Sequence, residues 1–266
     1  MTSAKAAFED LVALMDRLRK PGGCPWDREQ TWDTLRQYVI EEAYEVVDAI
    51  EHKRVDKVAE ECGDLLFEVV FLSQIAQENG WFDVYDAITS IRDKLVRRHP
   101  HVFADVKAET ARAVLQNWEA IKSAERVGEG QTSAVDGVPP ALPALARALK
   151  LGQKAARAGF DWADVSGAIA KVHEELQELQ DAIASKDANQ IRSELGDALF
   201  ALTSVARFLE VNPEDAAREA CTRFEERFRV MEKGIVESGH AVRDFDVDEL
   251  EGKWQAAKKF LRERAV

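Results

Sequence analysis

The sequence predicts an all-α protein made of two tandem copies of one four-helix domain. Apolar residues recur at helical spacing along nearly the whole chain, with no convincing strand alternation and no hairpin turn of the Asn-Gly kind. Residues 41–74 align without a gap to residues 174–207, and 12 of the 34 positions are identical. A stretch rich in Gly, Pro and small polar residues lies between the two copies. These observations indicate a repeated helical domain with a linker in the middle.

The first copy is predicted to be a series of amphipathic helices joined by short polar turns. The segment PGGCPWD at 21–27 is expected to be a loop, because Gly and Pro interrupt the helical pattern there. Asp83, which follows Gly80, is expected to cap the helix that begins after it. The predicted helices of this copy span residues 4–19, 28–51, 55–79, 84–98 and 109–125.

The second copy repeats this order of helices. A polar stretch at 185–189 separates its two long helices, as residues 52–56 do in the first copy. Asn212 followed by Pro213 is typical of an N-cap with Pro in the first helical turn. The predicted helices of this copy span residues 142–157, 164–184, 187–209, 213–236 and 247–264.

The repeat divides the 266 residues into two domains. We expect a first domain at 1–126, a linker at 127–141 and a second domain at 142–266. A hydrophobic content of 46% is sufficient for two small cores. Both copies carry apolar side chains on more than one helical face, so we expect the copies to pair with each other or across a homodimer.

Composition excludes several classes of protein. The net charge of −13 opposes nucleic-acid binding, which normally requires a basic patch. No apolar run approaches the roughly 18 residues of a membrane span, and the N-terminus lacks the apolar region of a signal peptide. We therefore expect a cytoplasmic protein that binds neither membranes nor nucleic acid. The three cysteines have no metal-ligand spacing and an odd count, which disfavours a zinc site or a disulfide framework.

Each copy carries two pairs of carboxylates at helical spacing. The two acids of an ExxE or ExxD motif are three residues apart and therefore share one face of a helix. Fifteen residues separate the pairs in each copy, enough to end one helix, turn, and begin an antiparallel one. We therefore expect the four acids of each copy to converge. They are Glu42, Glu45, Glu61 and Asp64 in the first copy, and Glu175, Glu178, Glu194 and Asp197 in the second.

Four converging carboxylates predict a metal site. They would repel one another in a partly dry pocket unless a cation compensates their charge. Oxygen ligands favour a hard cation, so we expect Mg²⁺, with Mn²⁺ as a substitute. A di-iron site is disfavoured because no His lies three residues after any of these glutamates. A single ExxE is more often a solvated helix face, but the repetition in register favours a site. A Gly before each Asp, Gly63 and Gly196, further predicts the close approach of another group.

Basic and aromatic residues follow each acidic hairpin at similar positions. An aromatic ring beside a cation suits a nucleobase and its phosphates, while packing of the Trp on a core is the equal alternative. The basic pairs are Lys94 with Arg98, and Arg223 with Arg227; the Trp–Lys pairs are Trp118 with Lys122, and Trp254 with Lys258.

The doubled motifs, EExxE followed by ExGD, resemble those of the MazG family. The resemblance extends to CPWD at 24–27, RRHPHVF at 97–103, the linker phrase DGVPPALPAL and the GFDW that opens the second copy. It covers nearly the whole chain. It implies an all-α, Mg²⁺-dependent enzyme that hydrolyses ribo- and deoxyribonucleoside triphosphates of many bases to the monophosphate and pyrophosphate. It also implies a homodimer and a housecleaning role towards noncanonical nucleotides.

The resemblance further implies roles for individual residues of the second copy. Metal binding falls to the four acids named above, and Glu174, Glu175 or Glu178 would accept the proton of the attacking water. Trp254 would lie near the nucleoside. The remaining predicted nucleotide-binding residues are Lys171, Glu174, Arg223, Arg227 and Lys258.

The two copies differ at one position that bears on activity. Where the second copy has Lys171, the first has Tyr38, which supplies no positive charge, so we expect the second copy to be the main catalytic site. The first copy keeps a complete acidic set, with Lys94, Arg98, Trp118 and Lys122 as its nucleotide-binding candidates. Two alternatives remain: a pyrophosphohydrolase for another nucleotide, such as dUTP or a nucleotide-sugar-like diphosphate, and a noncatalytic helical module that senses nucleotides or docks a partner.

Overall fold

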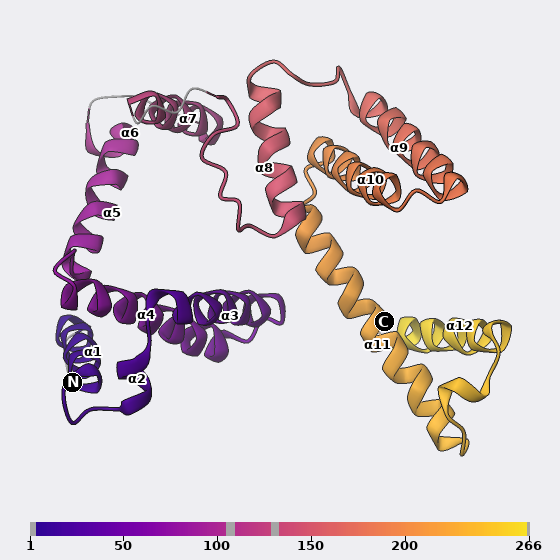
Figure 1. The fold of residues 1–266 in the computed structure, drawn as a ribbon, viewed down its shortest axis with the longest axis horizontal. Coiled ribbons are helices and arrows are strands. Elements are labelled where there is room, and N and C mark those ends of the chain that lie inside the picture. Colours follow the sequence, from indigo (N-terminus) through magenta and orange to yellow (C-terminus); the bar gives the residue numbers. More distant parts are fainter. Residues whose placement is uncertain (1–3, 105–109, 129–132, 265–266) are drawn as a thin grey trace. The chain divides into compact units, whose positions relative to one another are not determined.

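The computed structural model describes residues 4–104, 110–128 and 133–264, and these residues form α-helices joined by loops (Figure 1). No strand occurs within these ranges. The all-α prediction is therefore confirmed. The chain divides into two compact units, residues 1–124 and 125–266, and each is described by itself. Among the described residues, no helix is both long enough and apolar enough to cross a membrane.

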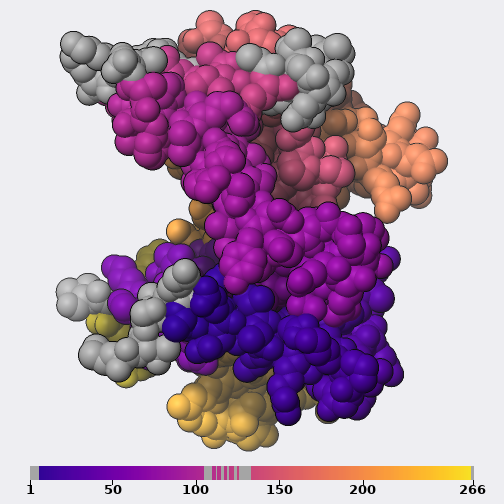
Figure 2. Space-filling view, turned by 90° about the vertical axis from the view of Figure 1, so that its left-hand side faces the viewer, coloured from indigo at the N-terminus to yellow at the C-terminus, as the bar shows by residue number. Residues whose placement is uncertain are grey.

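The first unit is organised around a long helical hairpin of α3 and α4, onto which α1 packs. The contact between α1 and α4 appears in the space-filling view as adjoining indigo and purple surfaces (Figure 2). The core of the first unit is formed by Met15, Leu35 and Phe71, each fully buried. The helices are α1 (Ala4–Arg19), α2 (Pro25–Glu29), α3 (Trp32–Glu51), α4 (Val55–Glu78), α5 (Val84–Arg98), α6 (Pro100–Phe103) and α7 (Ala111–Gly128).

The second unit repeats the hairpin with α9 and α10, and α8 packs on α10 as α1 packs on α4. Buried alanines such as Ala168, Ala182 and Ala198 allow these helices to approach closely. The long helix α11 contacts α8 near one end and α12 along the other, where Met231 and Ile235 form a small second core. The elements are α8 (Ala144–Arg157), α9 (Val165–Ser185), α10 (Ala188–Phe208), α11 (Pro213–Glu237), the 3₁₀ turn η1 (Val242–Asp244) and α12 (Val247–Arg264).

The prediction of one continuous helix over 28–51 is wrong. The chain forms the short helix α2 first, leaves the helical conformation at Gln30, and restarts at Thr31 as the N-cap of α3. The Thr31 hydroxyl accepts a hydrogen bond from the Thr34 backbone N–H at 3.3 Å, and the Thr34 hydroxyl accepts one from the Thr31 N–H at 2.9 Å. This reciprocal cap stabilises a helix start inside a sequence that otherwise looks continuous. Residues 25–27 of the predicted loop are consequently helical.

Two predicted helix starts are confirmed. Asp83 accepts hydrogen bonds from the backbone N–H groups of Tyr85 and Asp86, at 2.8 and 2.9 Å. Asn212 accepts one from the Glu214 N–H at 3.1 Å, and Pro213 occupies the first helical turn. The short helices α6 and η1 were not predicted, because three or four residues are too few to show helical periodicity.

The predicted linker is partly helical. α7 continues to Gly128 and so includes the first two residues of the predicted 127–141 segment, whereas residues 133–143 contain no helix. Part of the predicted helix at 109–125 and part of the linker lie outside the described residues.

Candidate functional site

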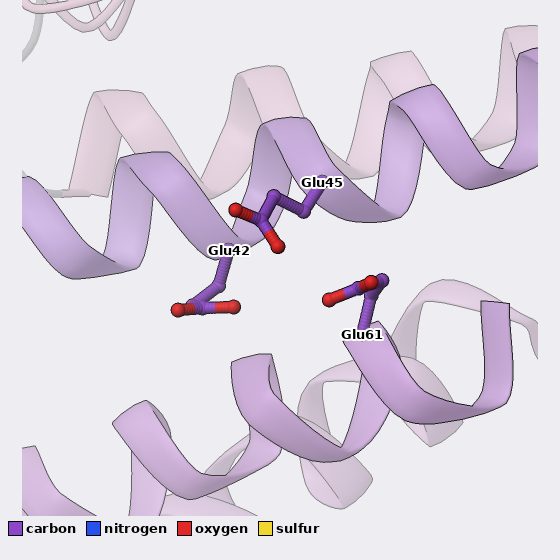
Figure 3. A group of neighbouring side chains, drawn as sticks. All are labelled: Glu42, Glu45 and Glu61. Atoms are coloured by element: carbon purple, nitrogen blue, oxygen red, sulfur yellow. The ribbon is translucent and has the colours of Figure 1, made fainter. Parts of the chain in front are cut away.

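The α3–α4 hairpin brings three carboxylates together in the first unit. Glu42 and Glu45 extend from one face of α3 towards Glu61 of α4 (Figure 3). One carboxylate oxygen from each residue lies within 4.8 Å of those of the other two. Glu61 is buried, Glu42 is half-buried and Glu45 is exposed, so the group opens from the helix interface towards solvent. We refer to Glu42, Glu45 and Glu61 as the first cluster.

The α9–α10 hairpin forms an equivalent group in the second unit. Oxygens of Glu175 on α9 and of Glu194 and Asp197 on α10 lie within 4.8 Å of one another. Glu175 is buried, with only 5% of its surface exposed, whereas Glu194 is half-buried and Asp197 exposed. These three residues are the second cluster.

In each copy the fourth predicted acid stands outside the cluster but close enough to act on it electrostatically. Asp64 is one of the charges that raise the pKa of Glu42. In the second copy the outlying acid is Glu178, whose pKa is raised by desolvation and then by repulsion from Glu175. The structure therefore gathers three of the four predicted acids of each copy around one point, with a different acid left outside.

Burial and mutual repulsion disfavour the charged forms of these acids. Desolvation raises the pKa of Glu42, and repulsion from Glu45 and Asp64 adds to it. Desolvation also raises the pKa of Glu61, followed by its hydrogen bond with Glu45. A cation placed among these oxygens would favour the charged forms and so oppose both the desolvation and the repulsion. The donor set of carboxylate oxygens, without nitrogen or sulfur, fits a hard divalent cation.

A lysine distinguishes the second cluster. Lys171 Nζ lies 2.6 Å from Glu175 and 2.8 Å from Glu174, and its hydrogen bonds, that with Glu174 first, raise the pKa of Lys171. In the first copy, Tyr38 occupies the equivalent position and packs against the core and the Trp26 ring, 5.8 Å between centroids. Lys57 approaches Glu61 only to 4.0 Å.

Glu68 is a buried acid, close enough to Glu42 for the two charges to repel, that the sequence comparison missed. It lies on α4, seven residues after Glu61 and four after Asp64, and therefore on the same helical face. Only 7% of Glu68 is exposed, and its Oε2 atom is buried without a hydrogen-bond partner among the described residues. Desolvation, followed by repulsion from Glu42, raises the pKa of Glu68 to about 7. Comparing the copies hid this residue, because Ala201 occupies its place in the second.

The predicted phosphate and nucleoside contacts of the second copy lie on α11 and α12, outside the α9–α10 hairpin. Arg223 is exposed and pairs with Glu219 of its own helix at 3.2 Å. Trp254 packs in the small α11–α12 core, with its ring 5.2 Å from that of Phe224. Arg227 and Lys258 are half-buried. Their roles towards a nucleotide remain predictions.

The corresponding residues of the first copy lie on α5 and α7. Lys94, Arg98 and Lys122 are half-buried. The Trp118 ring lies 5.8 Å from that of His99, and its Nε1 atom is buried without a partner among the described residues. These four residues also remain predictions as nucleotide contacts.

Within one chain, no group approaches Gly63 or Gly196 closely; the predicted approach of a group from outside the chain stays a prediction. A Cβ atom built at either position would meet no atom of the described residues within 4 Å. Both glycines are exposed on the hairpin helices. The structure gives no reason within one chain for a glycine before each of these aspartates.

Both hairpins lie within segments that match a known protein family. The sequence model described as the MazG nucleotide pyrophosphohydrolase domain matches residues 30–103 and 164–230, which contain both clusters. The nucleoside triphosphate pyrophosphohydrolase/pyrophosphatase MazG of Thermotoga maritima is 42% identical, over 97% of this chain and 98% of the relative. The nucleoside triphosphate pyrophosphohydrolase of Escherichia coli K12 is 45% identical, over 95% and 97%. A crystal structure of a mazG-related protein from Thermotoga maritima, 28% identical, covers 43% of this chain and 98% of its own, with a TM-score of 0.38.

Proposed function

Because the chain belongs to the MazG family of nucleotide pyrophosphohydrolases, we propose that it hydrolyses nucleoside triphosphates to the monophosphate and pyrophosphate. The observation that carries the proposal is the clustering of three carboxylates between the long helices of each hairpin. Such a cluster suits a divalent cation bound together with a triphosphate. We propose Mg²⁺ as this cation and Mn²⁺ as its substitute.

The second cluster is the proposed main catalytic centre. Glu175, Glu194 and Asp197 would hold the cation, which supplies charge to offset the triphosphate and to acidify an attacking water. Lys171 provides a positive charge at the same place, 2.6 Å from Glu175. When substrate binds, Lys171 would give up one of its hydrogen bonds to the glutamates and donate one to a phosphate oxygen instead.

Glu178 is the proposed proton acceptor. It stands outside the three-oxygen group, so it is free of the cation-holding role assigned to the others. It follows Glu175 by three residues on the same face of α9 and therefore lies beside the cluster, where the attacking water would be held. Glu174, the other candidate, already accepts a hydrogen bond from Lys171 at 2.8 Å and is better placed to orient that lysine.

The proposal extends to the range of substrates, the residues that contact the nucleotide and the oligomeric state. We propose hydrolysis of both ribo- and deoxyribonucleotides of many bases, as nucleotide-pool housecleaning in the cytoplasm. Arg223, Arg227 and Lys258 would bind phosphates and Trp254 the nucleoside, while the first cluster with Lys94, Arg98, Trp118 and Lys122 is a candidate second site. A homodimer is supported by the exposed apolar residues Leu195, Leu199 and Leu202 along α10.

Phosphorus NMR of the reaction products tests this function. The purified chain is incubated with ribo- and deoxyribonucleoside triphosphates, with Mg²⁺ or with chelator. Monophosphate with pyrophosphate, formed only with metal, is the expected result. Diphosphate with inorganic phosphate would contradict the proposed cleavage, and binding without turnover would favour a noncatalytic nucleotide-sensing module.

A further inference from the structure

An open cavity of about 470 Å³ lies in the second unit between α8, α10 and the loop that joins α8 to α9. Its volume falls within the range of small-molecule sites, roughly 300–1,000 Å³. The loop contributes Phe160 and Trp162 to the cavity wall, and α10 contributes Phe200. A Cβ atom at Gly167 would lie 2.7 Å from the Trp162 ring, so this glycine lets the ring pack directly on α9. Aromatic side chains from a loop and a helix therefore wall the cavity.

The cavity corresponds to a difference in side-chain size between the two copies. Ser204 lines it, and the gapless alignment places Ser204 opposite Phe71 of the first copy. Phe71 is fully buried in the first unit, in one core cluster with Met15 of α1. Since α8 packs on α10 as α1 packs on α4, the small side chain of Ser204 leaves open the space that a phenyl ring fills in the first unit. The fold thus accommodates an aromatic ring at this place.

Two polar side chains decide which ligands the cavity favours. Ser204 is only 5% exposed, and its hydroxyl forms no hydrogen bond among the described residues. A serine within a helix commonly donates to the carbonyl four residues earlier, as Ser73 does to Val69 at 2.8 Å. Arg207 donates hydrogen bonds to both carboxylate oxygens of Asp161, one of them at 3.0 Å, so their charges compensate each other. The cavity therefore offers a hydroxyl and a compensated ion pair, which favours a neutral ligand.

We propose that this cavity is a separate binding site for a small, neutral heteroaromatic molecule, an indole or a free nucleoside. The rings of Phe160, Trp162 and Phe200 supply apolar and aromatic contacts for a flat ring. The Ser204 hydroxyl can donate to, or accept from, a polar atom at the edge of that ring. Phe200 lies three residues after Asp197, so the cavity begins one helical turn beyond the second cluster. The predicted nucleotide contacts of α11 and α12 are not among its lining residues, so the site does not depend on the proposed function.

The test is fluorine NMR of two probes, 5-fluoroindole and 5-fluorouridine, titrated with the full chain in chelator and without triphosphate. Broadening of a probe signal measures binding. Ser204→Phe, which fills the cavity with the ring of the first copy, is expected to weaken binding about tenfold or more. The matched control Ser166→Phe adds the same ring at an exposed position outside the cavity lining and is expected to leave binding unchanged. Binding of one probe alone would identify the ligand as an indole or as a nucleoside. Binding of neither probe, or equal binding by Ser204→Phe, would overturn the proposal.

Thermal unfolding separates loss of the site from loss of the fold. Ser204→Phe is expected to unfold at or above the wild-type temperature, because the aligned Phe71 is fully buried in the same kind of hairpin. The bound probe is expected to raise the Tm of the wild type but not that of Ser204→Phe. Phe160→Ala changes a side chain that is 82% exposed and so leaves the core intact. It is expected to weaken probe binding about threefold or more. Wild-type affinity in Phe160→Ala would contradict the assignment, whatever the stability of Ser204→Phe.

Discussion

Single charged residues distinguish two hairpins that otherwise share their acids. Lys171 contacts Glu174 and Glu175 in the second copy, whereas Tyr38 packs into the core in the first. A triphosphate carries several negative charges, so a cation at this position favours its binding. At the scale of residues, we therefore expect the second copy to bind the substrate more tightly than the first.

Lys171→Ala is expected to raise the KM for a nucleoside triphosphate about tenfold or more, since a hydrogen bond to a charged group is worth about 1.5–3 kcal/mol. Lys171→Arg is expected to recover part of the loss, because it keeps the charge. Steady-state measurement of pyrophosphate release checks this. The control is Lys57→Ala, which removes a lysine near the first cluster. Equal effects of the two alanine variants would contradict a special role for Lys171.

Glu68 predicts a pH dependence of stability in the metal-free protein. Its folded-state pKa of about 7 lies above the ordinary value of 4.5, so the folded chain binds a proton more tightly than the unfolded chain. The free energy of unfolding should therefore fall as pH rises from about 4.5 to about 7. Glu68→Gln should flatten this dependence by on the order of 1 kcal/mol or more. Urea unfolding in chelator across this range measures it, and an unchanged slope in the variant would contradict the prediction.

At the scale of elements, capping decides where helices begin. Thr31→Ala removes the hydroxyl that caps α3 and should destabilise the protein by about 1 kcal/mol. Denaturant unfolding measures the change. Ser166→Ala is the control, because this exposed residue lies in the first turn of α9, where Asp164 supplies the capping side chain. A loss no larger than that of the control would show that the Thr31 cap contributes little.

The sequence was sufficient to predict the hairpins, because their apolar periodicity is long and their acids recur in register. It was not sufficient to predict the break before Thr31. The apolar pattern continues through this break, which is stabilised by hydrogen bonds between the backbone N–H groups and the side-chain hydroxyls of Thr31 and Thr34. The burial of Glu68 could not be predicted from the sequence, because it depends on how α3 and α4 pack. Gly63 and Gly196 make no close contact within one chain, because both are exposed on the hairpin helices.

At the scale of the whole molecule, exposed apolar side chains predict self-association. Leu195, Leu199 and Leu202 recur at helical spacing along α10 and are 50%, 47% and 50% exposed. Burying this stripe against a second copy would remove apolar surface from water. We expect light scattering after size exclusion to give twice the chain mass of 29.8 kDa.

Leu202→Glu is expected to shift this assembly towards the monomer, because it places a charge in the proposed interface. Val247→Glu is the control, since Val247 is 80% exposed at the start of α12, away from the stripe. A wild-type chain that is monomeric at micromolar concentration would contradict the homodimer.

The most direct test of the central claim compares pyrophosphate release by Glu178→Gln and Glu45→Gln, the aligned glutamates of the two hairpins. Glu178 is the proposed proton acceptor of the main site, so its loss should lower kcat about a hundredfold or more. Glu45→Gln should retain most of the activity. Activity that survives Glu178→Gln but is lost in Glu45→Gln would contradict the account and assign catalysis to the first copy.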